Sequence, residues 1–209
     1  MSNKASSEIV FASGNAGKIQ ELNDLLDPLG YSVRAQSEFG IEPVEETAIT
    51  FVENALLKAR EATERSGLPA LADDSGLEVD ALGGAPGLYS ARFAQANGRG
   101  SGDVANYEYL LEKLKDTPEC DRTARFRSVV VFLRHPKDPA PLISEGTWEG
   151  HILMAPEGTG GFGYDPVFCN HDTHTAAALL DKQIKNRLSH RGKAVANMIE
   201  KLAALNTTY

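Results

Sequence analysis

The chain has 209 residues, of which 42% are hydrophobic and 24% charged, and its formal net charge is −8. These values are typical of an ordinary globular protein with one sizeable α/β domain, folded as a single body or as two lobes. The acidic balance argues against broad binding to nucleic acids or anionic membranes, because both depend on clustered positive charge. A single nucleotide can still bind where a few cations converge or where a divalent metal supplies the charge.

The cysteines and the N-terminus indicate the cellular compartment. Cys120 and Cys169 stand far apart in the sequence and match no zinc-binding spacing. One disulfide remains open as an alternative, although a reduced cytoplasmic protein is the simpler interpretation. The N-terminus has no apolar stretch of signal-peptide length, and no segment approaches a transmembrane span. We therefore expect a cytoplasmic protein without a membrane partner.

The first part of the chain alternates strands and helices. After a polar, flexible tail at residues 1–7, the sequence predicts a buried strand (8–12), a helix (18–29) and a second strand (31–35). The turn after the first strand reads "SGNAGK" (13–18) and lacks both the first glycine and the final hydroxyl residue of a P-loop. A glycine turn that ends in a lysine still suits a phosphate, so the segment is either a phosphate cradle or a plain strand-to-helix turn.

The next helix is predicted from residue 51, because Thr50 and Glu53 form a capping box. The strand "ALADD" (70–74) follows, and we expect its two aspartates to end it at a Ser-Gly turn. The remaining elements predicted are a helix (102–115), a hairpin of two strands (123–135 and 141–153) and a last helix (189–205). Because alternating strands and helices are followed by a hairpin, we expect a mixed rather than a purely parallel sheet.

Asp73 and Asp74 are the first candidates for chemistry. Successive strand residues point to opposite faces, so one aspartate can enter a cleft while the other caps the turn. The alternatives are a turn cap, for which Asp, Ser and Gly are common, and a Mg²⁺ site, since that ion prefers carboxylate oxygen. Glu45 and Glu46 are further carboxylates that either bind the metal or lie on the solvated surface, whereas Glu53 is already explained as a capping residue.

Two aromatic residues stand among glycines in "GTGGFGYDP" (158–166). Phe162 and Tyr164 are costly to leave in water unless they pack or stack against another group. They therefore either plug the core at a tight turn or form a platform on which a purine base stacks.

The segment "SHRGKA" (189–194) breaks a rule of helix composition. Ser189 is a good N-cap, which places His190, Arg191 and Lys193 in the first helical turn. Cations there oppose the positive end of the helix dipole. Free backbone N–H groups beside basic side chains suit an anion or a hydrogen-bond acceptor, and the alternative is a solvated face.

Six motifs of the chain occur in the same order in a known family. They are "SGNAGK", "EETAITFVENALLKAR", "ADDSGL", "GGAPGLYSAR", "GGFGYDP" and "SHRGKA". With them the chain resembles the bacterial type of the inosine/xanthosine triphosphate pyrophosphatases, which hydrolyse non-standard purine nucleotides. The resemblance extends from about Glu8 to about Lys201.

The resemblance implies a fold and an activity. The fold is a single α/β domain over residues 1–209, with a long mixed β-sheet flanked by helices that form two lobes around a central cleft. The activity is the Mg²⁺-dependent conversion of ITP, dITP or XTP to the monophosphate and pyrophosphate by a cytoplasmic homodimer. Its partner would be a purine nucleotide, with no nucleic acid and no membrane.

The resemblance also implies roles for individual residues. Asp74 would be the general base and a metal ligand with Glu45, and Glu46 and Asp73 are alternative ligands. The residues that would bind substrate are Ser13, Gly14, Asn15, Ala16, Gly17, Lys18, Ser75, Arg92, Phe162, Gly163, Tyr164, Asp165, Lys185, His190 and Arg191. The chain departs from the family at Ala178, where family members often carry an acidic residue. A residue that pairs with that acid in other members would have no acidic partner in this chain.

Other functions fit the sequence less well. A pyrophosphatase for modified pyrimidine or methylated nucleotides would not explain "SHRGKA" and "GGFGYDP", which are typical of the purine family. A non-catalytic nucleotide sensor would not need a pair of aspartates beside a metal. Nucleic-acid binding is the least compatible with the negative net charge.

Overall fold

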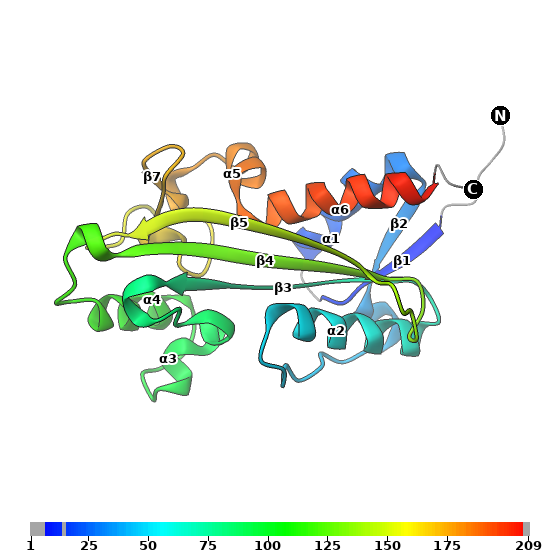
Figure 1. Cartoon of the computed structure of the whole chain (residues 1–209), viewed down its shortest axis with the longest axis horizontal. Coiled ribbons are helices and arrows are strands. Elements are labelled where there is room, and N and C mark those ends of the chain that lie inside the picture. The colour runs from blue at the N-terminus through cyan, green and yellow to red at the C-terminus, as the bar shows by residue number, and fades with distance from the viewer. Residues whose placement is uncertain (1–6, 14–15, 207–209) are drawn as a thin grey trace. The chain divides into compact units, whose positions relative to one another are not determined.

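The structure is a computed structural model that describes residues 7–13 and 16–206 (Figure 1). For residues 16–18, 21 and 206 the description covers the backbone alone. Both cysteines are free thiols, with Cys120 exposed and Cys169 buried. Within the described ranges, no helix is both long enough and apolar enough to cross a membrane.

Seven strands form one mixed sheet in the order β2-β1-β3-β4-β5-β6-β7. They are β1 (Ser7–Phe11), β2 (Tyr31–Ala35), β3 (Ala70–Val79), β4 (Thr123–Leu133), β5 (Leu142–Ile152), β6 (Phe168–Asn170) and β7 (Thr175–Ala176). β1 runs parallel to β2 and β3, with Ser7 opposite Tyr31 and Val10 opposite Ala70. β6 runs antiparallel to β5 and β7. The predicted mixed sheet is therefore confirmed.

The α-helices of the described residues are α1 (Ala16–Leu26), α2 (Phe51–Ser66), α3 (Phe93–Ala96), α4 (Asp103–Lys113), α5 (Lys182–Leu188) and α6 (His190–Asn206). The predicted start of α2 is confirmed, since the backbone N–H of Glu53 donates to the side chain of Thr50. Gly67 ends this helix with a φ of 72°, a left-handed conformation that favours glycine.

The chain divides into two compact units. The first unit holds Met1–Asp74, Val129–Glu145 and Ala194–Tyr209, and the second holds Ser75–Ser128 and Gly146–Lys193. β3, β4, β5 and α6 each contribute residues to both units. Each unit has a core of its own and is described separately.

The first unit buries apolar side chains on both faces of its strands. Ile9 and Phe11 of β1 pack with residues of α1 and α6, whereas Val10 packs with the alanines of α2, including Ala55 and Ala59. This division follows from strand geometry, because alternate side chains point to opposite faces. Figure 1 shows α1 and α6 on one side of these strands and α2 on the other.

The core of the second unit is built around aromatic rings. Phe126 of β4, Trp148 of β5 and Phe168 of β6 are buried together, and the ring centroids of Phe126 and Phe168 are 4.7 Å apart. Leu77 and Val79 of β3 belong to the same core.

One prediction about β3 was wrong. The strand does not end in a Ser-Gly turn after Asp74 but continues to Val79. The reason is that Leu77 and Val79 alternate into the core of the second unit, so that apolar burial extends the strand beyond the aspartates. Neither aspartate therefore serves as a turn cap.

Candidate active site

Asp74, Lys58 and Glu46 form a charged cluster in the first unit. Lys58 reaches the cluster from α2, and its Nζ lies 2.8 Å from Glu46 Oε1 and 3.1 Å from Asp74 Oδ1. Asp74 is buried within β3, whereas Glu46 is half-buried and lies in the segment before α2. One ammonium group thus holds two carboxylates that come from distant parts of the sequence.

The cluster perturbs the acidity of its members. Burial raises the pKa of Asp74, and the nearby charge of Glu46 raises it further against the opposing effect of Lys58. Burial alone would lower the pKa of Lys58, but the charges of Asp74 and Glu46 outweigh it and raise the pKa above its usual range. Lys58 therefore stays protonated, while Asp74 is a stronger proton acceptor than an exposed aspartate.

The same carboxylates fit a divalent metal. Mg²⁺ is usually held by one or two carboxylates together with water and substrate phosphates. Glu46 and Asp74 both place a carboxylate oxygen beside one cationic group, so the two carboxylates lie close enough together to share a cation. No group of three or more His, Cys, Asp or Glu side chains in the described residues could hold a metal unaided. These two residues would therefore hold Mg²⁺ in combination with a phosphate-bearing substrate.

The other predicted acids lie elsewhere. Glu45 is exposed, and it is the neighbouring Glu46 that contacts Lys58. Asp73 is buried, but it precedes Asp74 in a strand and so points to the opposite face. The carboxylate of Glu53 accepts a hydrogen bond from the hydroxyl of Thr50 at 2.7 Å, as a capping residue does.

The segment "SGNAGK" (13–18) follows β1, and its last three residues belong to α1. Ser13 is half-buried, and its N–H donates to the carbonyl of Phe11 at 2.8 Å. Gly14 and Asn15 lie outside the described residues. Ala16, Gly17 and Lys18 begin α1, and their side chains lie outside the described part as well.

An exposed aromatic ring lies beside two cations in the second unit. Phe162 is 58% exposed, although large apolar side chains are usually buried. Lys185 Nζ lies 4.8 Å and Arg191 Cζ 5.6 Å from the centroid of this ring. These distances are typical of cation–π contacts, which attract the two cations to the ring of Phe162.

The loop around Phe162 is held by two carboxylates. Asp165 is buried, forms an ion pair with Lys185 and accepts the N–H of Phe162 at 2.7 Å. Asp103, in the first turn of α4, accepts the N–H of Gly163 at 2.7 Å. A side chain at Gly161 would place its Cβ 2.1 Å from Asp165 Oδ2, so this close approach requires glycine.

Tyr164 has a different role from Phe162. It is 3% exposed, packs in the core of the second unit and donates its hydroxyl to the carbonyl of Ser90 at 2.8 Å. Burial raises the pKa of this hydroxyl well above its usual range. Tyr164 therefore plugs the core, whereas Phe162 is exposed, and its role as a stacking platform stays a prediction.

The first turn of α6 brings basic side chains to the same unit. The Ser189 hydroxyl accepts the N–H of Gly192 at 3.1 Å, which confirms the predicted N-cap. His190 is buried and stacks on Phe126, with ring centroids 4.7 Å apart and 12° between the planes. Arg191 lies over Phe162, and its Nη2 is 3.4 Å from the Ser75 hydroxyl.

Comparison with known proteins places the chain in a family. The family model described as "Ham1 family" matches residues 9–201. The chain belongs to the Ham1 family. A relative from Xanthomonas campestris pv. campestris (strain 8004), named dITP/XTP pyrophosphatase, is 57% identical, and the match covers 95% of this chain and 98% of the relative. A relative of the same name from Vibrio parahaemolyticus is 51% identical over 94% of this chain and 97% of its own.

Solved structures of Ham1 proteins have the same fold. The match to a Coxiella burnetii HAM1 protein has a TM-score of 0.87 at 45% identity, and it covers 97% of this chain and 100% of that chain. The Staphylococcus aureus Ham1 protein matches with a TM-score of 0.86 at 40% identity, over 95% of this chain and 100% of its own. The fold class predicted from the sequence is therefore confirmed.

Two more residues named from the resemblance are Arg92, a predicted substrate contact, and Ala178, where family members often carry an acid. The guanidinium of Arg92 lies 5.3 Å from the centroid of the exposed Tyr89 ring. Ala178 is buried, and a Cβ on Gly160 would be 2.5 Å from its carbonyl oxygen. The small side chain at position 178 therefore belongs to a tightly packed loop in this member of the Ham1 family.

Sequence reasoning missed Lys58 and Asp103. Lys58 lies within "EETAITFVENALLKAR", one turn after Asn54, and the side chain of Asn54 hydrogen-bonds Asp74 as well. Residues four apart lie on the same helix face, so this spacing could have indicated that Asn54 and Lys58 reach the same group. Asp103 resembles an ordinary acid in a first helical turn, so no local pattern distinguishes its contact with Gly163.

Proposed function

We propose that this Ham1 family chain is a nucleoside triphosphate pyrophosphatase that hydrolyses ITP, dITP and XTP to the monophosphate and pyrophosphate with Mg²⁺. The observation that carries the proposal is the Glu46–Lys58–Asp74 cluster, in which a buried carboxylate with a raised pKa lies beside a cation. The names of the relatives support the substrate class. Removal of such nucleotides would cleanse the nucleotide pool.

Asp74 is the residue that would accept a proton. In the proposed reaction a water attacks the α-phosphorus, the bond from that phosphorus to the oxygen bridging the α- and β-phosphates breaks, and pyrophosphate leaves. The proton of the water passes to the Asp74 carboxylate, whose raised pKa suits a general base. Lys58 holds the Asp74 carboxylate in place through its 3.1 Å contact.

Glu46 and Asp74 would hold Mg²⁺ with the substrate phosphates. When bound, the ion supplies positive charge that offsets the charge of the triphosphate and of the departing pyrophosphate. The glycine turn that leads into α1 would bind the phosphates through backbone N–H groups at a helix N-terminus.

The second unit would recognise the base. The open face of Phe162 suits stacking by a purine. Arg191 would donate to the 6-oxo group of hypoxanthine or xanthine. Adenine carries an amino group at that position, so the donor would be left unpaired at a cost of about 1–3 kcal/mol. This preference for an acceptor would exclude ATP, the most abundant competitor.

Product analysis tests the proposal. Wild type is incubated with ITP, XTP, GTP and ATP, with and without Mg²⁺, and the phosphate products are separated. We expect monophosphate and pyrophosphate from ITP and XTP when Mg²⁺ is present. Release of orthophosphate, or equal turnover of ATP, would contradict the substrate claim. Binding of ITP without any turnover would instead support a nucleotide sensor.

Two properties implied by the resemblance stay predictions. A homodimer would give twice the mass of the 22.5 kDa chain in sedimentation or light scattering. Cytoplasmic location would place the protein in the soluble fraction after cell lysis.

A further inference from the structure

Three side chains of α6 donate to backbone carbonyls of β5. Lys193 Nζ donates to the Thr147 carbonyl at 3.0 Å. Asn197 Nδ2 donates to the Glu145 carbonyl at 3.1 Å, and Lys201 donates to the Ile143 carbonyl. β6 pairs with β5 further along, at Gly150, His151 and Ile152. The helix side chains therefore satisfy carbonyls of β5 before the part that pairs with β6.

The regular spacing of these contacts has a simple geometric cause. Four residues advance a helix by about 6 Å, and two residues advance a strand by about 6.6 Å. Donors at every fourth helix position therefore meet carbonyls at every second strand position when the two elements run in opposite directions. This agreement between the two spacings fixes the register of α6 along β5. It also supplies hydrogen-bond donors to strand carbonyls that would otherwise accept from water or from another chain.

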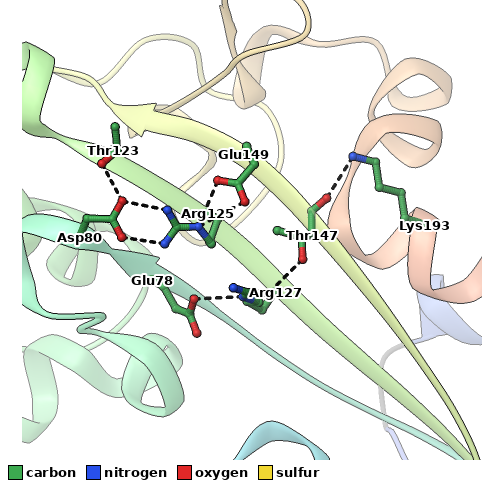
Figure 2. Close-up of polar contacts among 8 residues, drawn as sticks. All are labelled: Glu78, Asp80, Thr123, Arg125, Arg127, Thr147, Glu149 and Lys193. Atoms are coloured by element: carbon green, nitrogen blue, oxygen red, sulfur yellow. Dashed lines mark hydrogen bonds and ion pairs between the residues drawn. The ribbon is translucent and has the colours of Figure 1, made fainter.

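Lys193 is the contact nearest to the candidate site. It lies in the first turn of α6 with His190 and Arg191, where a cation opposes the helix dipole. Figure 2 shows that its ammonium group points to Thr147 on β5. The contact explains why a lysine is placed there without assigning it to a bound anion.

Thr147 in turn connects Lys193 to the sheet. Its hydroxyl accepts a hydrogen bond from Arg127 at 3.3 Å, and Arg127 pairs with Glu78 at 3.0 Å (Figure 2). The row Glu78–Arg127–Thr147–Lys193 thus runs from β3 through β4 and β5 to α6. It anchors the first turn of the helix to three strands of the second unit.

A neighbouring row on the same strands provides a comparison. Arg125 pairs with Asp80 at 2.7 Å and with Glu149 at 3.0 Å (Figure 2). These contacts link β4 to β5 and to the residue that follows β3, and they include no residue of α6. The row through Arg127 differs because it continues to the helix that carries Arg191.

We propose that Lys193 is a positioning residue for the base-binding turn, and this inference rests on the proposed function. Its contact with Thr147 holds the first turn of α6 so that Arg191 lies over Phe162. Lys193 does not touch the nucleotide itself. Loss of its side-chain donor displaces Arg191 and weakens nucleotide binding, while the chemistry at Asp74 is unaffected.

The test compares Lys193→Met with Lys201→Met. Both changes remove a lysine of α6 that donates to a β5 carbonyl, but Lys201 is two turns further from the site. We expect Lys193→Met to raise KM for ITP about three- to tenfold with kcat nearly unchanged, because one charged donor is lost. Lys201→Met should leave KM unchanged, even where it lowers thermal stability as much. Equal KM values for Lys193→Met and wild type would overturn the proposal.

Lys193→Gln separates positioning from a direct charge effect. Glutamine keeps a donor for the Thr147 carbonyl but carries no charge, so we expect KM close to that of wild type. If Lys193→Gln and Lys193→Met raise KM equally, the charge of Lys193 acts on the nucleotide, and the proposed positioning role is wrong.

Hydrogen exchange gives a readout that does not need turnover. The N–H groups of Gly192 and Lys193 both donate to Ser189, to its hydroxyl and its carbonyl respectively. We expect Lys193→Met to speed exchange in the peptide that covers this turn and Lys201→Met not to do so. Failure of wild type to cleave ITP would refute the proposed function alone, whereas unchanged exchange in Lys193→Met would refute the positioning role.

Discussion

The two groups of candidate site residues are electrostatic opposites. In the first unit, Glu46 and Asp74 place two carboxylates around the ammonium group of Lys58. In the second unit, Lys185 and Arg191 place two cations beside the aromatic ring of Phe162. The first arrangement can accept a proton and hold a metal, whereas the second can stack a base and donate hydrogen bonds.

Under the proposed function, the first unit would carry the catalytic residues and the second unit would recognise the base. Changes in the carboxylate group should lower kcat, because those residues would act on the reacting phosphate. Changes in the aromatic group should raise KM or alter base preference, because those residues would act on the base, away from the reacting phosphate. Measuring kcat and KM separately for each variant therefore tests whether the two groups of residues have different roles.

The largest effect is expected for Asp74→Asn. An amide cannot take the proton of the attacking water, so kcat for ITP should fall about 10²–10⁴-fold while nucleotide binding persists. Steady-state kinetics and calorimetric titration with ITP measure the two effects. Asp73→Asn is the matched control, because this neighbouring aspartate is equally buried and points to the opposite strand face. An equal loss of kcat in both variants would contradict the assignment of the base to Asp74.

A smaller effect is expected for Phe162→Ala. The change removes the exposed ring on which the base would stack, and KM for ITP should rise about tenfold to a hundredfold with little change in kcat. Phe162→Leu keeps an apolar side chain without a π-face and should give an intermediate KM. A fall in kcat at unchanged KM would show that Phe162 acts on the chemical step instead.

Arg191→Met should change which base is preferred. If Arg191 donates to the 6-oxo group, its loss lowers the ratio of kcat/KM for ITP to that for ATP by about tenfold. Competition assays with both nucleotides measure the ratio. Arg187→Met serves as the control, because Arg187 is an exposed basic residue in α5. An unchanged ratio in Arg191→Met would assign base selection to other groups.

Local patterns in the sequence account for most of the fold. The capping box at Thr50, the N-cap at Ser189 and the alternation along β1 depend on neighbouring residues, and the structure has all three. Local patterns did not predict the residue at which β3 ends. Asp, Ser and Gly are common turn residues, but burial of Leu77 and Val79 outweighs that tendency.

The site was less predictable because its key contacts are long-range. Lys58 and Asp74 are sixteen residues apart, and Arg191 and Ser75 are separated by 116. Sequence spacing cannot show such contacts, so the sequence alone could not tell that Glu46, rather than Glu45, pairs with Lys58. The resemblance to a family placed residues at the site, but the structure was needed to separate an open Phe162 from a buried Tyr164.

The smallest predicted effect concerns stability and again contrasts the two units. Arginine side chains hold the pKa values of Asp138 in the first unit and Asp80 in the second well below the usual range. The Asp138 side chain is 1% exposed and that of Asp80 is 46% exposed. Water therefore reaches the carboxylate of Asp138 much less than that of Asp80, although Arg134 is more exposed than Arg125.

Because the folded pKa of Asp138 is lowered, its contribution is complete above the unfolded pKa of about 3.9 and is lost as pH falls through the folded value. Asp138→Asn should lower the free energy of unfolding by about 1.5–3 kcal/mol at pH 7, and by progressively less as pH falls below about 3.9. Asp80→Asn should cost no more than about 1 kcal/mol at pH 7. Urea unfolding at several pH values measures both, and equal losses would show that burial does not decide the strength of these pairs.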